Sequence, residues 1–507
     1  MCTDIALTKL SREIASARSI RRTFLALGIA ATLVASPHAL DVSISVTLGE
    51  DRGQGLGTLF EARDQDGDVI AGAGFDDAHA TYLRDNHRQV VFFVKPPSSQ
   101  PAISKLGKPF GPDNNGTRLQ VVDDRLVAFH RGGNAVAFQT LGAGDTWIRN
   151  NEAWTKTANA FGGVQIVENR HLVFEGSTIR YDGEVIYESQ LGSGRYYYVD
   201  GRLFLYHAKP DRLYVVAWEP GRTVSLDAAE VFDIVGNVFT YGVYDDQVLI
   251  TTNVGEFYSY ESGLWTRHRA TDGKSWQGYS MLRFYDKVLI GHYPSGSLYQ
   301  YDRDGLRPFE PRLPVPDGVS INAREAQTLA IYGGYLYVGV WPWGEVWRFD
   351  QETKTWSFVG RVFEQPTMIK EDQEPFARAM KDKPAPYNYW GQRVTSLTNF
   401  HDSLYIATMN KQGQPHLPVH DFLDDETIAQ YGAIHRLHVP GQVAAAFEWK
   451  DETTFRFVAE GNELTIYQDG KLLGRASTTD AMMVDEVPVI ELENGIYGPL
   501  RGKAVRR

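Results

Sequence analysis

Three histidines occupy the same place in a repeated phrase of this chain. The phrase is a turn residue followed by a short apolar strand that stops at a small or polar residue, and it occurs eight times. In three copies the sixth residue after the turn is His130, His207 or His292. A histidine at a strand end can act as a general base, or it can pack as a semi-buried polar residue. Both interpretations stay open at this point.

The spacing of the phrase predicts the architecture that must position these histidines. Most gaps between copies are about 45 residues, the length of one four-stranded propeller blade. The clearest copy predicts strands that end at Phe284, span 288–293 and 297–301, and follow Gly305. We therefore expect an all-β fold, a seven- or eight-bladed β-propeller of four-stranded antiparallel blades. The copies begin at Asp68, Asp124, Arg170, Gly201, Asp246, Asp286, Gly334 and Asp402.

The chain divides into three predicted parts. Residues 1–39 resemble an export signal, residues 40–443 carry the propeller, and residues 444–507 contain further hairpins. A terminal hairpin pair of this kind either completes the first blade and closes the ring or forms a small β-appendage. The sequence leaves these two outcomes open.

One face of the propeller is predicted to carry the site. The fourth-to-first-strand connections and the second-to-third-strand loops emerge on the same face of a blade. Arginine beside tryptophan or tyrosine suits a sugar ring that also carries a carboxylate, although such aromatics also fill the spaces between blades. The candidate substrate-binding residues on this face are Arg131, Asn134, Arg195, Tyr241, Trp276, His292, Arg324, Trp341, Trp343, Trp390 and Arg393.

Two long insertions, 361–392 and 411–432, also fall on this face. The second contains His416, His420 and Asp421, which are weak candidates for metal ligands because Pro418 disfavours the helix that would align them. No cofactor is required by the predicted chemistry, and a divalent metal is possible. The acidic run from Asp64 to Asp68 is expected to be an ordinary hairpin turn.

The net charge and the N-terminal sequence limit which partners and which cell compartment are expected for this protein. The 507-residue chain has a net charge of −12 and no basic stripe, which argues against nucleic acid. Arg21-Arg22 before a short apolar run resembles a twin-arginine signal, with an ordinary secretory signal as the alternative. About ten apolar residues are too few to span a membrane. Cys2, the only cysteine, lies in the part that would be removed. We expect a periplasmic or secreted protein without a membrane span.

Three functions compete for the predicted site. Cleavage of a uronate polymer by β-elimination needs a cation for the carboxylate, a base and an acid. The chain offers His130 and His207 as bases, Tyr196 as acid and Arg212 as the cation. Hydrolysis needs two facing carboxylates, and Glu325, Asp211 and Asp421 form no obvious pair. A propeller that binds a glycan or a protein without catalysis is the third possibility.

Two resemblances to known families bear on the fold and on the first of these functions. The run at residues 347–356, WRFDQETKTW, resembles the outer hairpin of bacterial kelch-like or sugar-active propellers, which implies a propeller fold and not an activity. The histidine, tyrosine and arginine on one face are similar in layout to propeller-fold polysaccharide lyases such as the ulvan lyases. The resemblance implies a lyase that acts on an acidic polysaccharide, with those residues in the catalytic roles.

Overall fold

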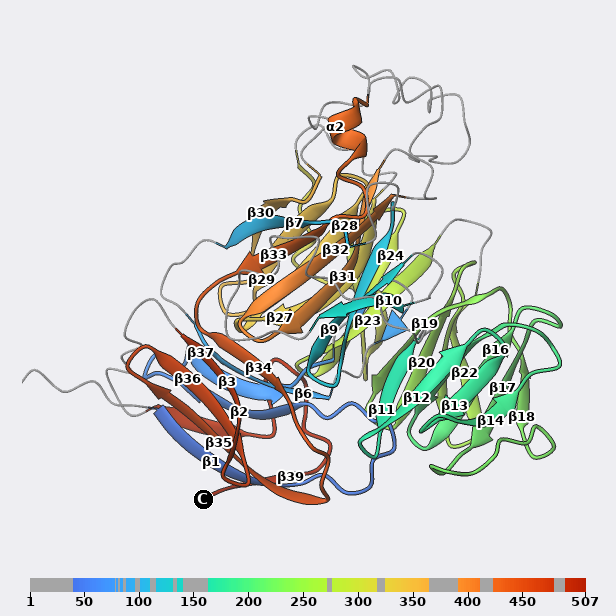
Figure 1. Cartoon of the computed structure of the whole chain (residues 1–507), viewed down its shortest axis with the longest axis horizontal. Coiled ribbons are helices and arrows are strands. Elements are labelled where there is room, and N and C mark those ends of the chain that lie inside the picture. Colours follow the sequence, from blue (N-terminus) through green and yellow to red (C-terminus); the bar gives the residue numbers. More distant parts are fainter. Residues whose placement is uncertain are drawn as a thin grey trace, which may run out of the picture. The chain divides into compact units, whose positions relative to one another are not determined.

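Antiparallel β-sheets that follow one another along the chain make up this computed structural model (Figure 1). Residues 37–507 form one compact unit. The backbone alone is described at 79–80, 83–84, 130 and 135–139. The structure describes residues 40–77, 79–80, 83–84, 88–95, 101–109, 115–130, 135–139, 163–270, 276–316, 324–363, 391–410, 423–477 and 488–507.

Five consecutive sheets have four strands each, in simple sequence order. Each begins with an apolar strand and turns tightly into the second strand, as the repeated phrase predicts. The first sheet contains β11 (Val164–Val167), β12 (Arg170–Glu175), β13 (Thr178–Tyr181) and β14 (Glu184–Glu188). The second contains β15 (Gly194–Val199), β16 (Arg202–His207), β17 (Arg212–Ala217) and β18 (Glu230–Asp233). The third is β19 (Val238–Tyr244), β20 (Gln247–Thr252), β21 (Phe257–Glu261) and β22 (Leu264–Arg269).

The fourth sheet is the one that the sequence predicted in most detail. It contains β23 (Gln277–Phe284), β24 (Lys287–Tyr293), β25 (Leu298–Asp302) and β26 (Gly305–Pro308), which agree with the predicted strands to within a residue or so at their shared ends. The fifth contains β27 (Glu325–Tyr332), β28 (Tyr335–Trp341), β29 (Glu345–Asp350) and β30 (Thr355–Arg361).

Two further sheets flank these five. One contains β8 (Thr117–Val122), β9 (Arg125–His130) and β10 (Ala135–Gln139). The other contains β31 (Gln392–Phe400), β32 (Ser403–Asn410) and β33 (Ile434–His438), extended by β7 (Ala102–Gly107). At its other edge are the short strands β4 (His79–Ala80) and β5 (Leu83–Arg84).

Neighbouring sheets are joined through their first strands. Gln165 of β11 exchanges hydrogen bonds of 2.9 and 2.8 Å with the backbone of Tyr198 in β15. Between β31 and β8, the Leu119 backbone N–H donates to the Ser396 hydroxyl at 2.9 Å, so the sheet late in the chain lies against an early one. The all-β propeller fold with four-stranded antiparallel sheets is confirmed. The number of blades stays a prediction.

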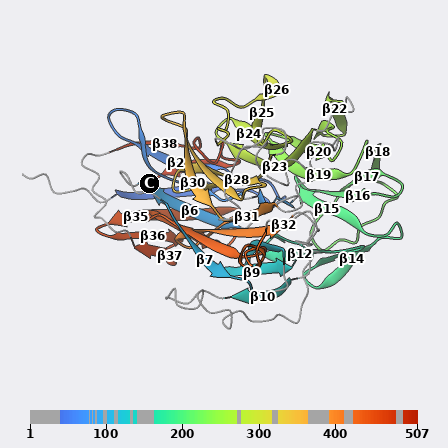
Figure 2. The same cartoon turned by 90° about the horizontal axis from the view of Figure 1, so that it is seen from above.

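Strands from both ends of the chain form two more sheets, here called the terminal sheets (Figures 1 and 2). Their shared core includes Ile44, Phe60 and Phe457, with the two phenylalanine rings 5.4 Å apart. The predicted boundary after residue 443 falls inside the strand β34 (Gln442–Ala446). One sheet contains β1 (Leu40–Thr47), β35 (Glu452–Glu460), β36 (Glu463–Gln468), β37 (Lys471–Ser477) and β39 (Lys503–Arg506). The other contains β2 (Thr58–Arg63), β3 (Val69–Phe75), β6 (Gln89–Val94), β34 (Gln442–Ala446) and β38 (Val489–Leu492).

The terminal sheets contact the turns between the first and second strands of the propeller sheets. Arg501 lies 3.1 Å from carboxylate oxygens of both Asp200 and Asp246, which belong to two neighbouring turns. Trp449 and Asn169 exchange hydrogen bonds of 2.7 and 3.1 Å at a third turn. These contacts cover the turn end of the sheets they reach. A ligand site on the propeller is therefore expected at the opposite end.

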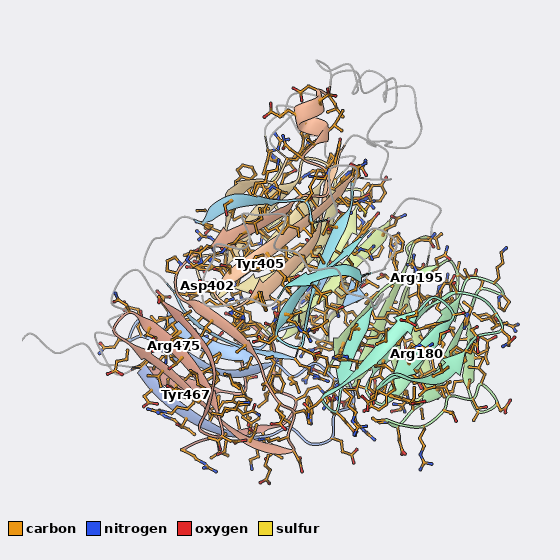
Figure 3. The ribbon with its side chains drawn as sticks, in the orientation of Figure 1. Arg180, Arg195, Asp402, Tyr405, Tyr467 and Arg475 are labelled. Carbon is orange, nitrogen blue, oxygen red and sulfur yellow. The ribbon has the colours of Figure 1, made fainter. Side chains whose placement is uncertain are left out.

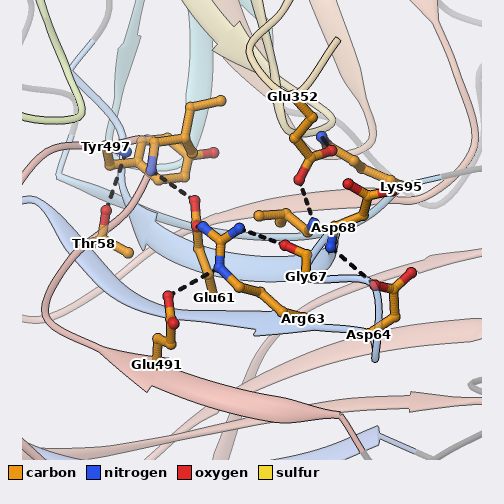
Figure 4. Close-up of polar contacts among 12 residues, drawn as sticks. Thr58, Glu61, Arg63, Asp64, Gly67, Asp68, Lys95, Glu352, Glu491 and Tyr497 are labelled. Carbon is orange, nitrogen blue, oxygen red and sulfur yellow. Dashed lines mark hydrogen bonds and ion pairs between the residues drawn. The ribbon is translucent and has the colours of Figure 1, made fainter.

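Figure 4 shows the polar contacts where the terminal sheets meet the hairpin between β29 and β30. Lys95 Nζ lies 2.7 Å from a carboxylate oxygen of Glu352, and the Val69 backbone N–H donates to the same side chain. Within the terminal sheets, Arg63 lies 2.6 Å from Glu61 and 2.9 Å from Glu491. The Glu352 contacts therefore link the terminal sheets to the sheet of β27 to β30. The Arg63 contacts hold the terminal sheets themselves together.

Candidate functional site: the loop face of the propeller sheets

The loop face is defined here as the end of the propeller sheets where first strands begin, second strands end and fourth strands end. Antiparallel order puts these three kinds of strand end together. Arg195 near the start of β15, His207 at the end of β16 and Arg269 at the end of β22 lie there. This is the end of the sheets opposite the turns that the terminal sheets contact.

His207 is completely buried at the end of β16. Its Nε2 lies 3.3 Å from the Tyr187 hydroxyl, and its ring centre lies 5.4 Å from that of Tyr196. Burial lowers the pKa of His207, and the Gly192 carbonyl acts in the opposite direction. The imidazole is therefore packed among tyrosine rings and has no exposed surface.

Tyr196 is 8% exposed and packs edge-on against Tyr187, with ring centres 6.0 Å apart. Burial raises the pKa of Tyr196 to about 12, which holds its proton more tightly than an exposed tyrosine would. The predicted acid and base therefore meet, but in a packed aromatic cluster.

Arg212 is not packed within this aromatic cluster, and only the backbone of His130 is described. Arg212 is opposite His207 in the register of β16 and β17, but its side chain is exposed and its Nε lies 2.8 Å from Asp233. The bond to Asp233 raises the pKa of Arg212. His130 ends β9, where only the backbone is described.

His292, the third histidine of the phrase, is the penultimate residue of β24 and is 5% exposed. Its Nδ1 lies 2.7 Å from the Ser295 hydroxyl, and its ring centre is 5.0 Å from Trp276 and 4.9 Å from Tyr299. Burial, with a smaller contribution from the Arg269 charge, lowers the pKa of His292 to about 3. His292 therefore stays neutral over the range in which most proteins work.

The predicted sugar-stacking aromatics are mostly covered. Tyr241 stacks on Tyr197 with ring centres 4.9 Å apart, and burial raises its pKa. Trp341 is fully buried beside Tyr279 and Tyr293, and Trp343 is 4% exposed. These rings fill space between strands, which is the alternative role that the sequence left open.

Two of the predicted arginines form buried ion pairs. Arg324 lies 2.6 Å from Glu345, and both side chains are completely buried. Arg393 lies 3.1 Å from Glu325, which also accepts a hydrogen bond of 2.6 Å from Gln327. A buried charge is costly unless it is paired, so each arginine depends on its glutamate partner at this position.

Three guanidinium groups on the loop face lie over aromatic rings, and we call them the three arginine–aromatic pairs. The Arg195 Cζ is 5.7 Å from the Phe239 ring centre (Arg195 is labelled in Figure 3). The Arg269 Cζ is 4.7 Å from Trp276, and the Arg361 Cζ is 5.1 Å from Trp343. Arg195 is exposed, whereas Arg269 and Arg361 are half-buried. Each guanidinium also donates to a backbone carbonyl: Val238, Gly255 and Trp343, respectively.

Sequence reasoning missed two of these arginines. Arg269 and Arg361 are the last residues of the fourth strands β22 and β30. Their position at a fourth-strand end was the signal that could have placed them on the loop face. First- and second-strand ends point only to their aromatic partners, Trp276 and Trp343.

Several predicted residues lie outside the described part of the chain: Arg131, Asn134, Trp390, His416, His420 and Asp421. Within the described residues, no group of three or more histidine, cysteine or acidic side chains could hold a metal ion. The candidate hydrolase residues Glu325 and Asp211 have other partners, Arg393 and the Tyr206 hydroxyl.

Two cavities lie beside the terminal sheets. One, of about 390 Å³, is lined by Arg88, Asn169, Lys450 and Asp469 among others. The other, of about 230 Å³, is lined by Asp245, Arg283 and Arg501 among others. Both contain residues from the turns that the terminal sheets contact, so neither belongs to the loop face.

Comparison with known proteins gives similarity of fold only. No family model matches the sequence, and no curated protein matches it. Solved structures that resemble it include BamB from Moraxella catarrhalis, with 13% identity, a TM-score of 0.33, and coverage of 79% of this chain and 98% of that one. YCF48 from Cyanidioschyzon merolae has 11% identity, a TM-score of 0.36, and coverage of 66% and 99%. At these low scores the fold assignment depends on the strand pairing described above.

No helix in the described ranges has the length and apolar character needed to cross a membrane.

Proposed function

We propose that this protein is an exported carbohydrate-active protein that engages an acidic, uronate-containing polysaccharide on its loop face. The observation that carries the proposal is the set of three arginine–aromatic pairs. A guanidinium binds a carboxylate through directed, charge-assisted hydrogen bonds. A guanidinium that lies over an aromatic ring occurs at three places on this face.

The aromatic rings also position the guanidinium groups. A cation that lies over a ring face gains roughly 0.5–1 kcal/mol at an exposed site, which favours one orientation of the side chain. A backbone carbonyl accepts a further hydrogen bond from each guanidinium. An arginine fixed in this way loses less conformational freedom when a carboxylate binds.

The proposed activity is β-elimination. A cation neutralises the C6 carboxylate, a base removes the C5 proton, and an acid protonates the oxygen that leaves C4. The product carries a new C4–C5 double bond, and no redox cofactor is needed. His207 and Tyr196 are buried and are poorly placed for these roles. His130 is therefore the base that this activity would require.

Binding without cleavage is the second candidate function. It is favoured by the burial of His207 and Tyr196, because their covered positions explain both residues without catalysis. The two functions share the same ligand class and the same face. They differ only in whether the polymer is shortened.

One experiment tests the proposal and separates its two forms. The purified mature chain is titrated calorimetrically with uronate polymers and with neutral polymers of the same linkage, while the ultraviolet absorbance of the unsaturated product is followed. The proposal predicts binding to at least one uronate polymer that weakens with added salt. An increase in absorbance indicates lyase activity, and its absence with retained binding indicates a binding protein. Equal binding to uronate and neutral polymers contradicts the proposal.

A further inference from the structure

We infer that the ligand is a long segment of polymer that lies across the loop face and contacts more than one propeller sheet. It is not a single sugar held in the middle of the ring of first strands. This inference rests on the proposed function, and it defines the size and placement of the ligand.

The space between the first strands is occupied by the chain itself. The hairpin of β4 and β5 leaves the terminal sheets after β3 and returns before β6. Ala80 of β4 pairs with Ser396 of β31, and the same hairpin packs against the first strands β19, β23 and β27. First strands of several sheets therefore surround β4 and β5, and a sugar cannot occupy the same space.

Buried polar contacts hold the base of this hairpin. Asn399 Nδ2 donates to the Asp76 carboxylate at 3.0 Å, and Gln442 Nε2 donates to the Asn399 carbonyl oxygen at 2.9 Å. Gln89, the first residue of β6, donates at 2.9 Å to the backbone carbonyl of Asn399. Asn399, Gln89 and Gln442 are almost completely buried. Asp76 and Gln89, which lie on either side of the hairpin, are therefore both held to β31 by buried hydrogen bonds.

The three arginine–aromatic pairs are distributed over different sheets. Arg195 comes from β15 and Phe239 from β19, so the first pair bridges two sheets. Arg269 ends β22 and Trp276 precedes β23, which places the second pair at the next junction. Arg361 ends β30, and Trp343 lies in the loop between β28 and β29 of the same sheet. A ligand that contacts more than one pair must extend from one sheet to another.

A ligand of this kind gains affinity with length. Once the first uronate is bound, the next one meets its arginine at a high effective concentration, so linked sites bind more tightly than separate ones. We expect affinity to rise by roughly 10²-fold from the monosaccharide to an oligomer that reaches two pairs, and then to level off.

The test is a calorimetric titration with a uronate monomer, dimer, tetramer and octamer of the polymer identified in the binding screen. Arg195→Gln and Arg361→Gln are each expected to reduce the gain from tetramer to octamer by about tenfold, with smaller effects on the dimer. Arg202→Gln is the matched control. Arg202 belongs to the same sheet as Arg195 and lies 5.7 Å from the Tyr260 ring, but at the turn end of β16. Arg195→Lys keeps the charge and serves as a second variant if Arg195→Gln is poorly folded.

The outcomes separate this inference from the function on which it rests. Equal affinity for monomer and octamer overturns the extended site and leaves uronate binding intact. A gain with length that persists in both glutamine variants, or that is lost equally in Arg202→Gln, also overturns it. Failure to bind any uronate overturns the proposed function itself.

Discussion

The Nε2 of His207 lies 3.3 Å from the hydroxyl of Tyr187, inside a cluster that also contains Tyr196 and Tyr214. A histidine at this strand end could have faced a substrate, and here it is completely buried. This burial favours packing as the reason for a histidine at this position of the phrase. The catalytic and the structural role of His207 can be separated by experiment.

Substitution of the cluster should change stability more than function. His207→Ala removes a fully buried ring and should lower the free energy of unfolding by about 2–4 kcal/mol. Tyr196→Phe removes only a hydroxyl and should change it by less than about 1 kcal/mol. Arg212→Ala, at an exposed ion pair, should leave the melting temperature nearly unchanged. Urea and thermal unfolding measure these effects. Loss of turnover by orders of magnitude with unchanged stability in His207→Ala would restore the catalytic role.

Acid should destabilise the protein through its buried histidines. Burial lowers the pKa of both His292 and His435 to about 3, with smaller contributions from Arg269 and Lys105, respectively. The unfolded chain takes up a proton on each below about pH 6.5 while the folded chain does not. Stability should therefore fall as the pH falls from about 6.5 toward 3, by about 1.4 kcal/mol per pH unit for each histidine.

Variants identify the histidines responsible for this pH dependence. Urea unfolding at several pH values should give a shallower slope for His292→Gln and for His435→Gln than for the unchanged protein. Identical slopes in all three proteins would show that other groups cause the acid sensitivity.

The terminal sheets should loosen when Arg501 is removed. Arg501 bonds Asp200, Asp246 and the Asp245 carbonyl, the last at 2.7 Å. Its side chain is 33% exposed, so we expect Arg501→Ala to cost only about 1–2 kcal/mol. Hydrogen exchange should become faster at the turns around Asp200 and Asp245.

The matched control for this prediction is Arg475→Ala. Arg475 lies 3.2 Å from Glu463 within one terminal sheet and is exposed (Figure 3). Its removal should leave exchange at both turns unchanged. Equal exchange in the two variants would mean that Arg501 does not hold the terminal sheets against the propeller.

Export remains a prediction from the sequence, because residues 1–39 lie outside the described part of the chain. Replacement of Arg21 and Arg22 by lysine should leave precursor in the cytoplasm if the twin-arginine route is used. Cell fractionation with N-terminal sequencing of the exported chain measures this, and processing is expected close to Ala39. Unchanged processing would point to the general secretory route.

Much of the strand pattern could be predicted from the sequence because it is local. The turn at Asp286 and the alternation of the following residues predict β24 directly, and the phrase at Asp402 likewise predicts β32. The phrase at Asp68 also forms a strand, β3. That strand pairs with β6, which in turn pairs with β34 from the C-terminal part of the chain. A pairing between residues so far apart leaves no local signal, so the terminal sheets could not be derived from the repeat.

The site was predicted less well than the strands, for a physical reason. The phrase places His207 at a strand end, but its burial depends on Tyr187 and Tyr196, which come from β14 and β15. Trp343 looks like a sugar platform in sequence, and its position under Arg361 depends on how β30 ends. Composition and spacing predict which residues approach a face. Packing between neighbouring strands decides which of them remain accessible.

The most direct measurement is an experimental structure of the protein with a bound uronate oligosaccharide. We predict that the carboxylates lie within hydrogen-bond distance of at least two of Arg195, Arg269 and Arg361, with the sugar on the loop face. An oligosaccharide bound instead in the cavity beside Arg88 or the cavity beside Arg283 would contradict this placement. So would a sugar that displaces β4 and β5 from between the first strands.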